Sequence, residues 1–290
     1  MVTLRTASSK RRIEAGLAWL GLVPFFLFGI AFEIIPVLTL ARSSLMDKDV
    51  LTLTQFERAL TPLFIESFRN SIQLSAATSL LGVVFGTIVA QAIVTTRNQF
   101  MRDAITALAD VTTNFGGAPL AFAFIVVLGS TGVVTLLLKM IGINLYPTTF
   151  RIYSIQGLMV AYLYFQLPLM ILLVIPSLLG LRREWREAAI NLGASSAQYW
   201  LRVALPILAP SLLGGFLLLF ANAFGAYATA WTLTGPDVNL VTVQIAALVR
   251  GEVQLDPALA DALAMLSLLT MTICVAGYQW LGGRTRKGAR

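Results

Sequence analysis

The segment RREWREAAINLGASSAQYWLRVALP, residues 182–206, lies between two apolar runs that are each long enough to cross a bilayer. A helix is expected to begin just after Gly180, where the preceding run ends. Glu184 and Glu187 then lie near its N-terminal end, where the helix dipole favours negative charge. Gly193 is suited to end this helix, because glycine readily adopts the backbone conformation found at helix C-termini. The segment therefore predicts a short charged helix outside the membrane.

The second half of the segment predicts a return into the membrane. The two small residues Ala188 and Ala189 leave a helix face that another surface can approach closely. A second short helix is expected from Ala194 to Leu201. Pro206 fits the first turn of the next apolar helix, since a first-turn N–H has no partner within the helix. Together these features predict a rigid elbow, and the alternative is an ordinary amphipathic connector whose charges are merely solvated.

The rest of the chain is apolar enough for a polytopic membrane protein. Hydrophobic residues occupy 57% of the 290 positions, 12% are charged, and the mean hydropathy is +0.80. A soluble chain of this length would have to hide that excess in its core, whereas here apolar runs recur along nearly the whole sequence. The prediction is an all-α membrane protein with six transmembrane helices, at residues 17–41, 68–95, 110–138, 154–180, 205–232 and 259–281.

Basic residues gather in alternate loops, which predicts the orientation of the chain. The segments 1–16, 96–104, 181–204 and 282–290 hold 14 of the 21 Lys and Arg residues. Loops rich in Lys and Arg stay on the cytoplasmic side of a membrane. We therefore expect both termini and the elbow in the cytoplasm, and a helix from Val238 to Val249 at the outer interface. Because the basic residues lie between apolar spans rather than on one face, nucleic acid is not an expected partner.

The same boundaries divide the chain into four parts. We expect a cytoplasmic tail, a first transmembrane helix with its external loop, a core of five transmembrane helices and a short cytoplasmic tail, at residues 1–16, 17–64, 65–282 and 283–290. The basic start superficially resembles a secretory signal. The apolar run from Leu17 to Leu40 is too long for one and lacks a small-residue cleavage site, so we expect it to be retained.

The elbow carries a spaced motif. An E-A-A triplet is followed after three residues by a glycine, and nine residues later by V-A-L-P. This spacing resembles the signature loop of binding-protein-dependent ABC importer permeases of the type I, MetI-like fold, in which isoleucine usually stands where this chain has Val203. The residues that match are Glu187, Ala188, Ala189, Gly193, Leu205 and Pro206.

The resemblance implies a function and a set of partners. In such permeases the elbow is a coupling helix that inserts into a cleft of an ATPase subunit, with Glu187 as the expected polar contact. The resemblance also implies a second permease subunit, two ATP-binding subunits, an extracytoplasmic solute-binding protein and the cytoplasmic (inner) membrane of a bacterium. This chain has no G-x-x-x-x-G-K-[S/T] loop to hold phosphates. ATP and Mg are therefore expected on the partner ATPase, and no cofactor or catalytic residue is expected here.

Polar residues at membrane depth are candidates for a solute pathway, because they are costly in lipid. Asn114 precedes the F-G-G-A-P stretch at residues 115–119, where a broken helix would line a cavity. The fifth span reads FANAFGAYATAWTLTGP at residues 220–236 and is similar to a stretch in permeases for polyamines, phosphonates, ferric iron and thiamine. The expected pathway residues are Asn114, Gln166, Asn222, Phe224, Gly225 and Tyr227. Ordinary packing between helices is the alternative for each of them.

Composition excludes several other chemistries. The chain has no histidine, which excludes histidine bases, Ser-His-Asp triads and His-ligated metals. Its single cysteine, Cys274, lies in the last apolar run and excludes a disulfide within the chain. The resemblance to importer permeases implies an ATP-driven importer for a small charged solute, such as a polyamine or a phosphonate, and ferric iron, thiamine or a sugar are the alternative solutes.

An ion-coupled secondary transporter is the competing function. It needs a coupling acid near the membrane midplane. Glu33, in the first span, is the only plausible one, since Asp110 is expected at a solvated helix end. Inverted repeats are not evident in the sequence, which weakens this alternative.

Overall fold

The computed structural model describes residues 22–47, 50–146, 150–252 and 255–288, with side chains as far as Trp280. Six helices within these ranges are long and apolar enough to cross a membrane, which confirms the predicted architecture. They are Leu22–Leu45, Pro62–Thr95, Gly117–Met140, Ile155–Leu179, Ser196–Phe224 and Pro257–Trp280. The expected tail at residues 1–16 and the start of the first span lie outside the described residues.

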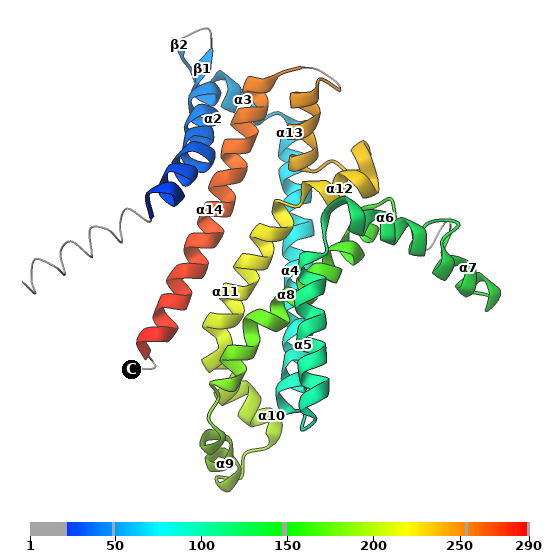
Figure 1. Cartoon of the computed structure of the whole chain (residues 1–290), viewed down its shortest axis with the longest axis vertical. Coiled ribbons are helices and arrows are strands. Elements are labelled where there is room, and N and C mark those ends of the chain that lie inside the picture. The colour runs from blue at the N-terminus through cyan, green and yellow to red at the C-terminus, as the bar shows by residue number, and fades with distance from the viewer. Residues whose placement is uncertain (1–21, 48–49, 147–149, 253–254, 289–290) are drawn as a thin grey trace, which may run out of the picture.

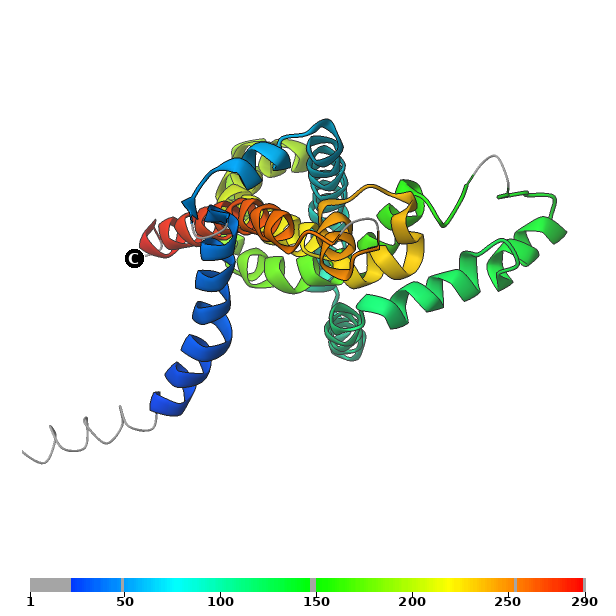
Figure 2. The ribbon, with the colours of Figure 1, turned by 90° about the horizontal axis from the view of Figure 1, so that it is seen from above.

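The first described helix diverges from the others (Figure 2). It includes the π-helical turn η1 (Ile30–Ile34) and α2 (Ile35–Leu45), and its most apolar stretch has no buried residue. The external segment that follows contains the antiparallel strands β1 (Met46–Asp47) and β2 (Val50–Leu51) and the short helix α3 (Thr54–Ala59). Arg58 of α3 forms an ion pair with Asp256, which holds this segment against α14.

Four long helices form the bundle, namely α4 (Pro62–Thr95), α8 (Ile155–Leu179), α11 (Leu205–Phe224) and α14 (Pro257–Gly288) (Figure 1). The first three pack against one another, and α14 packs against α11. Glycine allows α4 and α8 to approach closely, because a Cβ at Gly86 would lie only 2.7 Å from the Cβ of Met170. Helix α4 begins at Pro62, and α14 continues through residues 283–288.

The region 110–138, expected as a third span with a break near residues 115–119, is covered by three helices. They are α5 (Gln99–Asn114), α6 (Gly117–Leu128) and α7 (Val133–Met140), of which α6 and α7 together form the apolar span. The first break falls in the predicted F-G-G-A-P stretch, where Gly117 has a positive φ of 70°. The second break was missed; there a Cβ at Gly132 would lie 2.6 Å from the carbonyl oxygen of Val127. Seen from above, α6 and α7 extend away from the bundle, whereas α5 packs along α8 (Figure 2).

The fifth span ends before the expected residue 232. Helix α11 ends at Phe224, and α12 (Tyr227–Thr234) starts after a break at Gly225 and Ala226. The turn η3 (Gly235–Asp237) then leads to α13 (Val241–Arg250), bent by 79° relative to α12 and η3. Helix α13 confirms the expected helix at 238–249. Its start is tied to α4, because Asn70 Nδ2 donates to the Asn239 carbonyl at 3.1 Å and Val241 N–H donates to Ser71 Oγ at 2.9 Å.

Candidate functional site

The elbow, residues 182–206, lies at one end of the bundle, which we call the elbow end (Figure 1). Its first arm is α9 (Arg183–Asn191), and none of the residues of this helix is buried. Apolar side chains are exposed here as well, and Leu192, just after the helix, is 88% exposed. A short helix without a buried face gains little stability from packing against the rest of its own chain. Its exposed surface is therefore available for contact with another protein.

Glu187 lies on this exposed helix. Its Oε1 accepts a hydrogen bond from Arg183 Nε at 3.0 Å, one helical turn earlier. Both side chains are largely exposed, so this pair contributes at most a few tenths of a kcal/mol to stability. Arg182 lies over the ring of Trp185, 5.8 Å from its centroid. The carboxylate of Glu187 is therefore displayed at the surface, where a partner can reach it at little cost.

Gly193 ends α9 as expected. Its φ is +81°, and no atom lies within 4 Å of where a Cβ would be, so the backbone conformation alone requires glycine. Ser195 then caps α10 (Ser196–Tyr199) in a capping box with Gln198. This box was not predicted, although the S-x-x-Q spacing at 195–198 is its signature.

The second arm of the elbow is not the separate helix 194–201 that was expected. After α10 the chain forms a π-helical turn, η2 (Trp200–Ala204), and passes into α11 without a break. Leu205 N–H donates to the Trp200 carbonyl in this turn, five residues back. The second arm is therefore the N-terminal part of the same helix as α11. A displacement of α9 is passed to the membrane span through this continuous helix, which begins at Ser196.

Helix breaks in the third and fifth spans meet at a cavity of about 430 Å³, which we call the central cavity. The end of α5 and start of α6 lie on one side of it, and the junction of α11 and α12 lies on the other. Three predicted pathway residues line it: Asn222, Gly225 and Tyr227. Asn114 is not among the lining residues, and its Nδ2 donates to the Asp110 carbonyl of its own helix at 2.9 Å.

The other two predicted pathway residues pack between helices. Gln166 is fully buried; its Nε2 donates to Thr78 Oγ1 at 2.8 Å, and its Oε1 accepts from Ser79 Oγ at 3.3 Å. Phe224 is buried and its ring stacks on Phe220 with centroids 5.9 Å apart. Their side chains thus join α8 to α4 and fill the bundle, and the case for a pathway rests on the three lining residues.

Arg250 was not anticipated by the sequence analysis. Its guanidinium carbon lies 5.6 Å from the ring centroid of Tyr227 and 5.5 Å from that of Trp231. The two rings stack on each other, so one cation contacts both. Arg250 is the last residue of α13, and no periodic pattern connects it to residues about 20 positions earlier. The contact joins α13 to the residue that lines the central cavity.

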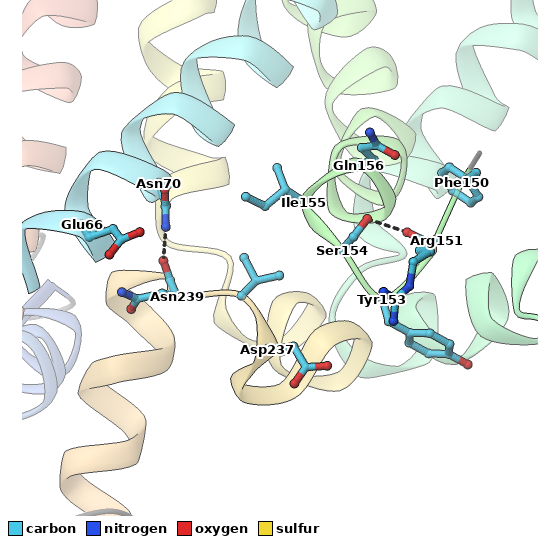
Figure 3. Close-up of a pocket in the computed structure, with 11 residues that line it drawn as sticks. Glu66, Asn70, Phe150, Arg151, Tyr153, Ser154, Ile155, Gln156, Asp237 and Asn239 are labelled. Carbon is cyan, nitrogen blue, oxygen red and sulfur yellow. Dashed lines mark hydrogen bonds between the residues drawn. The ribbon is translucent and has the colours of Figure 1, made fainter. Parts of the chain in front are cut away.

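A wider pocket of about 760 Å³, which we call the far pocket, is shown in Figure 3. The start of α4, which borders it, lies toward the end of the bundle opposite the elbow (Figure 1). The pocket lies between the starts of α4 and α8 and the turn η3. Glu66 and Asp237 contribute carboxylates and Arg151 a guanidinium. None of these three has an ion-pair partner within the described part of the chain.

The two acids considered for ion coupling, Glu33 and Asp110, do not line the central cavity. Glu33 is on the exposed face of η1, in the helix that diverges from the bundle. Asp110 lines a pocket of about 590 Å³ between α5 and α8, together with Arg102 and Asp103. Asp110 is exposed within α5 and lies among other charged groups, and neither acid is among the lining residues of the central cavity.

Comparison with known proteins gives a family match over most of the chain. Residues 82–287 match the family described as "Binding-protein-dependent transport system inner membrane component". A protein of Haemophilus influenzae, named as a ferric transport system permease, is 26% identical over 98% of this chain. One of Prototheca wickerhamii, named as a sulfate transport system permease, is 32% identical over 67% of this chain and 72% of its own length. The thiamine transport system permease protein ThiP of Salmonella typhimurium is 30% identical over 53% of this chain.

This chain covers less than half of the length of two of these relatives. The chain spans 44% of the length of the ferric relative and 28% of that of the thiamine relative. A solved bacterial ABC transporter for alginate import has a subunit with a TM-score of 0.70 and 16% identity, covering 98% of this chain and 99% of that subunit. A second structure shows an alginate transporter in complex with a periplasmic protein bound to an alginate pentasaccharide. Its matching chain has a TM-score of 0.76 and 17% sequence identity, and the match covers 95% of this chain and 96% of that chain. These two structures establish the fold.

Proposed function

Because the chain belongs to the family of binding-protein-dependent transport system inner membrane components, we propose that it is the permease subunit of an ATP-driven ABC importer. The observation that supports this most is the exposed elbow. It displays the E-A-A motif on a helix with no buried face and continues into a membrane span. A partner that moves the elbow thereby moves α11.

That partner is an ATPase with two ATP-binding subunits, one for each of two permease subunits. ATP and Mg bind to the ATPase, and this chain contributes no catalytic residue. Binding of ATP draws the two ATPase subunits together, and each carries an elbow with it. The elbow end is then cytoplasmic, as the clustering of basic residues indicates, and both termini face the cytoplasm of a bacterium.

The solute crosses at the central cavity. Gly116 and Gly117 interrupt one span there, and Gly225 interrupts another, so backbone groups line the cavity beside Asn222. Broken helices are tolerated at membrane depth where they line such a space. Movement of α11 alters the end of this helix at Phe224 and Gly225, and the cavity opens alternately to the two sides of the membrane.

The far pocket is the docking region for an extracytoplasmic solute-binding protein. It borders the start of α4, toward the end of the bundle opposite the elbow (Figure 1), and presents unpaired charges of both signs (Figure 3). Charged groups that lack internal partners are suited to steer and orient a partner surface. Solute released there reaches the central cavity through the membrane.

We retain a small charged solute as the proposed cargo. The first expectation, a polyamine or a phosphonate, has no counterpart in the names of the relatives, which refer to ferric iron, sulfate and thiamine. All three of these solutes carry charge. The ion-coupled alternative has no support in the central cavity, because neither Glu33 nor Asp110 lines it.

Purification and transport test the proposal. The complex purified from membranes is expected to contain an ATPase, and reconstituted vesicles are expected to take up solute only with ATP and the solute-binding protein. Glu187→Ala should lower ATP-driven uptake at least tenfold with the complex still assembled. Glu184→Gln, which removes a charge from the same exposed helix outside the motif, should stay within twofold of the parent.

Two results would contradict the proposal. Uptake driven by an ion gradient without ATP would favour the secondary transporter. Unchanged uptake by Glu187→Ala, in a complex that contains the ATPase, would remove the coupling role of the elbow.

A further inference from the structure

A third cavity, of about 540 Å³, lies where the elbow meets the bundle. Helix α4 forms one wall through Val83, Ile88 and Gln91, and Leu212 of α11 lies on the other. The elbow closes one end with Arg186 and Trp200. We call this cavity the elbow groove. Most of its lining is apolar. Gln91, Thr95 and Arg186 lie toward the elbow end, and Thr87 is the polar residue of the deeper part.

The length of the elbow groove matches one leaflet of a bilayer. Its lining on α4 runs from Val83 to Thr95, and at 1.5 Å per residue this is about 18 Å along the helix. Half of the hydrocarbon core of a bilayer is about 15 Å thick. A chain of lipid carbons lying against α4 would therefore extend from the membrane midplane to the level of the elbow.

The chemistry of the elbow groove changes along that length as in a phospholipid. Val83, Val84 and Ile88 line the deeper part, and Gln91 follows one turn closer to the elbow. Trp200 lies at the end, where tryptophan is enriched in membrane proteins because its ring is both apolar and polar. From the deeper part toward the elbow, the lining thus changes from mainly apolar side chains to the amide of Gln91 and then to the guanidinium of Arg186.

Arg186 is the group that selects a headgroup. It has no ion pair or hydrogen bond within the described residues, in contrast to Arg183 on the same helix, which pairs with Glu187. A guanidinium at the mouth of an apolar groove matches a phosphate, which it can bind through two N–H groups at once. Basic pockets between spans on the cytoplasmic side are suited to anionic lipid headgroups.

From this arrangement we propose that an anionic phospholipid binds in the elbow groove, with an acyl chain along α4 and its phosphate on Arg186. The lipid joins the coupling helix α9 to the membrane span α4. Anionic lipid thereby sets how firmly the elbow is held relative to the bundle. The proposal depends on the proposed function only for placing the groove in the cytoplasmic leaflet.

Native mass spectrometry of the purified complex tests the proposal. After exchange into detergent with phosphatidylglycerol or phosphatidylcholine of identical acyl chains, the parent is expected to retain phosphatidylglycerol preferentially. Arg186→Gln should reduce that preference about fivefold, the effect of one cation near an anionic headgroup. Arg202→Gln, an exposed arginine of the elbow outside the groove, should leave it unchanged. Ile88→Trp, which fills the groove, should lower retention of both lipids.

Three outcomes would overturn the proposal. The parent would retain the two lipids equally, or Arg186→Gln would retain phosphatidylglycerol as the parent does. Alternatively, Ile88→Cys in a Cys274→Ser background, labelled on its thiol with a photoactivatable cross-linker, would cross-link to a helix of another subunit, which would show that protein fills the groove. Because retention is measured without transport, a failure of the proposed importer function would leave these results interpretable.

Discussion

Gly193 acts through its backbone, since its φ is +81° and no neighbour crowds it. Left-handed backbone costs a residue with a Cβ about 1–2 kcal/mol, and asparagine less than most. We expect ATP-driven uptake to fall in the order Gly193, Gly193→Asn, Gly193→Ala and Gly193→Val, measured in vesicles with equal amounts of assembled complex. Equal rates for the asparagine and valine variants would show that the turn is not needed in this conformation.

Gln166 is expected to matter for stability rather than for solute selection. Gln166→Leu removes the hydrogen bonds to Thr78 and Ser79 between α8 and α4. Such bonds are worth about 0.6 kcal/mol each within membranes, so the variant should unfold at a slightly lower temperature in detergent. The KM for solute should not change. A changed KM with unaltered stability would return Gln166 to the pathway.

Sequence predicts a residue's role best when its partners are near in the chain. The E-A-A motif and Gly193 belong to one short segment, and the structure forms the helix and turn that they predict. Gln166 was left open between pathway and packing, because its partner Thr78 is 88 positions away. Arg250 was missed for the same reason, since its contact with Tyr227 depends on how α13 folds back.

In two helices a π-helical turn precedes a proline, a feature that was not predicted from the sequence. The π-helical turns at Ile30–Ile34 and Trp200–Ala204 each precede a residue that is followed by a proline, Pro36 or Pro206. Proline lacks an N–H and its ring clashes with the carbonyl four residues back. A hydrogen bond that spans five residues, such as the one from Ile35 N–H to the Ile30 carbonyl, pairs the backbone N–H just before the proline. The helix therefore passes the proline instead of starting there.

Packing of α4 against α8 depends on Gly86. A Cβ there would lie 2.7 Å from the Cβ and 2.9 Å from the Cγ of Met170, so the helices must move apart. Gly86→Ala should therefore lower stability by about 1–3 kcal/mol. Gly29→Ala is the matched control, because no atom lies within 4 Å of its Cβ position. Thermal unfolding in detergent measures both, and a Gly86→Ala protein as stable as the control would contradict the close packing.

At the scale of the whole molecule, the breaks in two spans explain what the hydropathy pattern could not predict. The apolar runs at 110–138 and 205–232 are long enough for single helices, and length alone gave six spans correctly. Apolar composition does not say in which direction a segment runs after a break. Gly117 and Gly225 redirect the chain, and the central cavity forms where the two breaks meet.

Movement across that cavity can be tested with a disulfide. A Cβ at Gly117 would lie 3.7 Å from the Cβ of Ala228, within the range found between bonded cysteines. Gly117→Cys with Ala228→Cys, in a Cys274→Ser background, should cross-link α6 to α12 on oxidation. Uptake should then stop, because the two helices must separate for solute to pass, and a reductant should restore it.

The single variants are the controls for this experiment. Gly117→Cys alone measures the strain of a side chain at a φ of 70°, and Ala228→Cys alone measures any effect of the thiol in the cavity. Neither should respond to oxidant. If the cross-linked protein transports at the rate of its reduced form, α6 and α12 move as one body and the solute passes elsewhere. If the oxidised protein loses uptake but still hydrolyses ATP, the elbow has been uncoupled from a cavity that no longer opens.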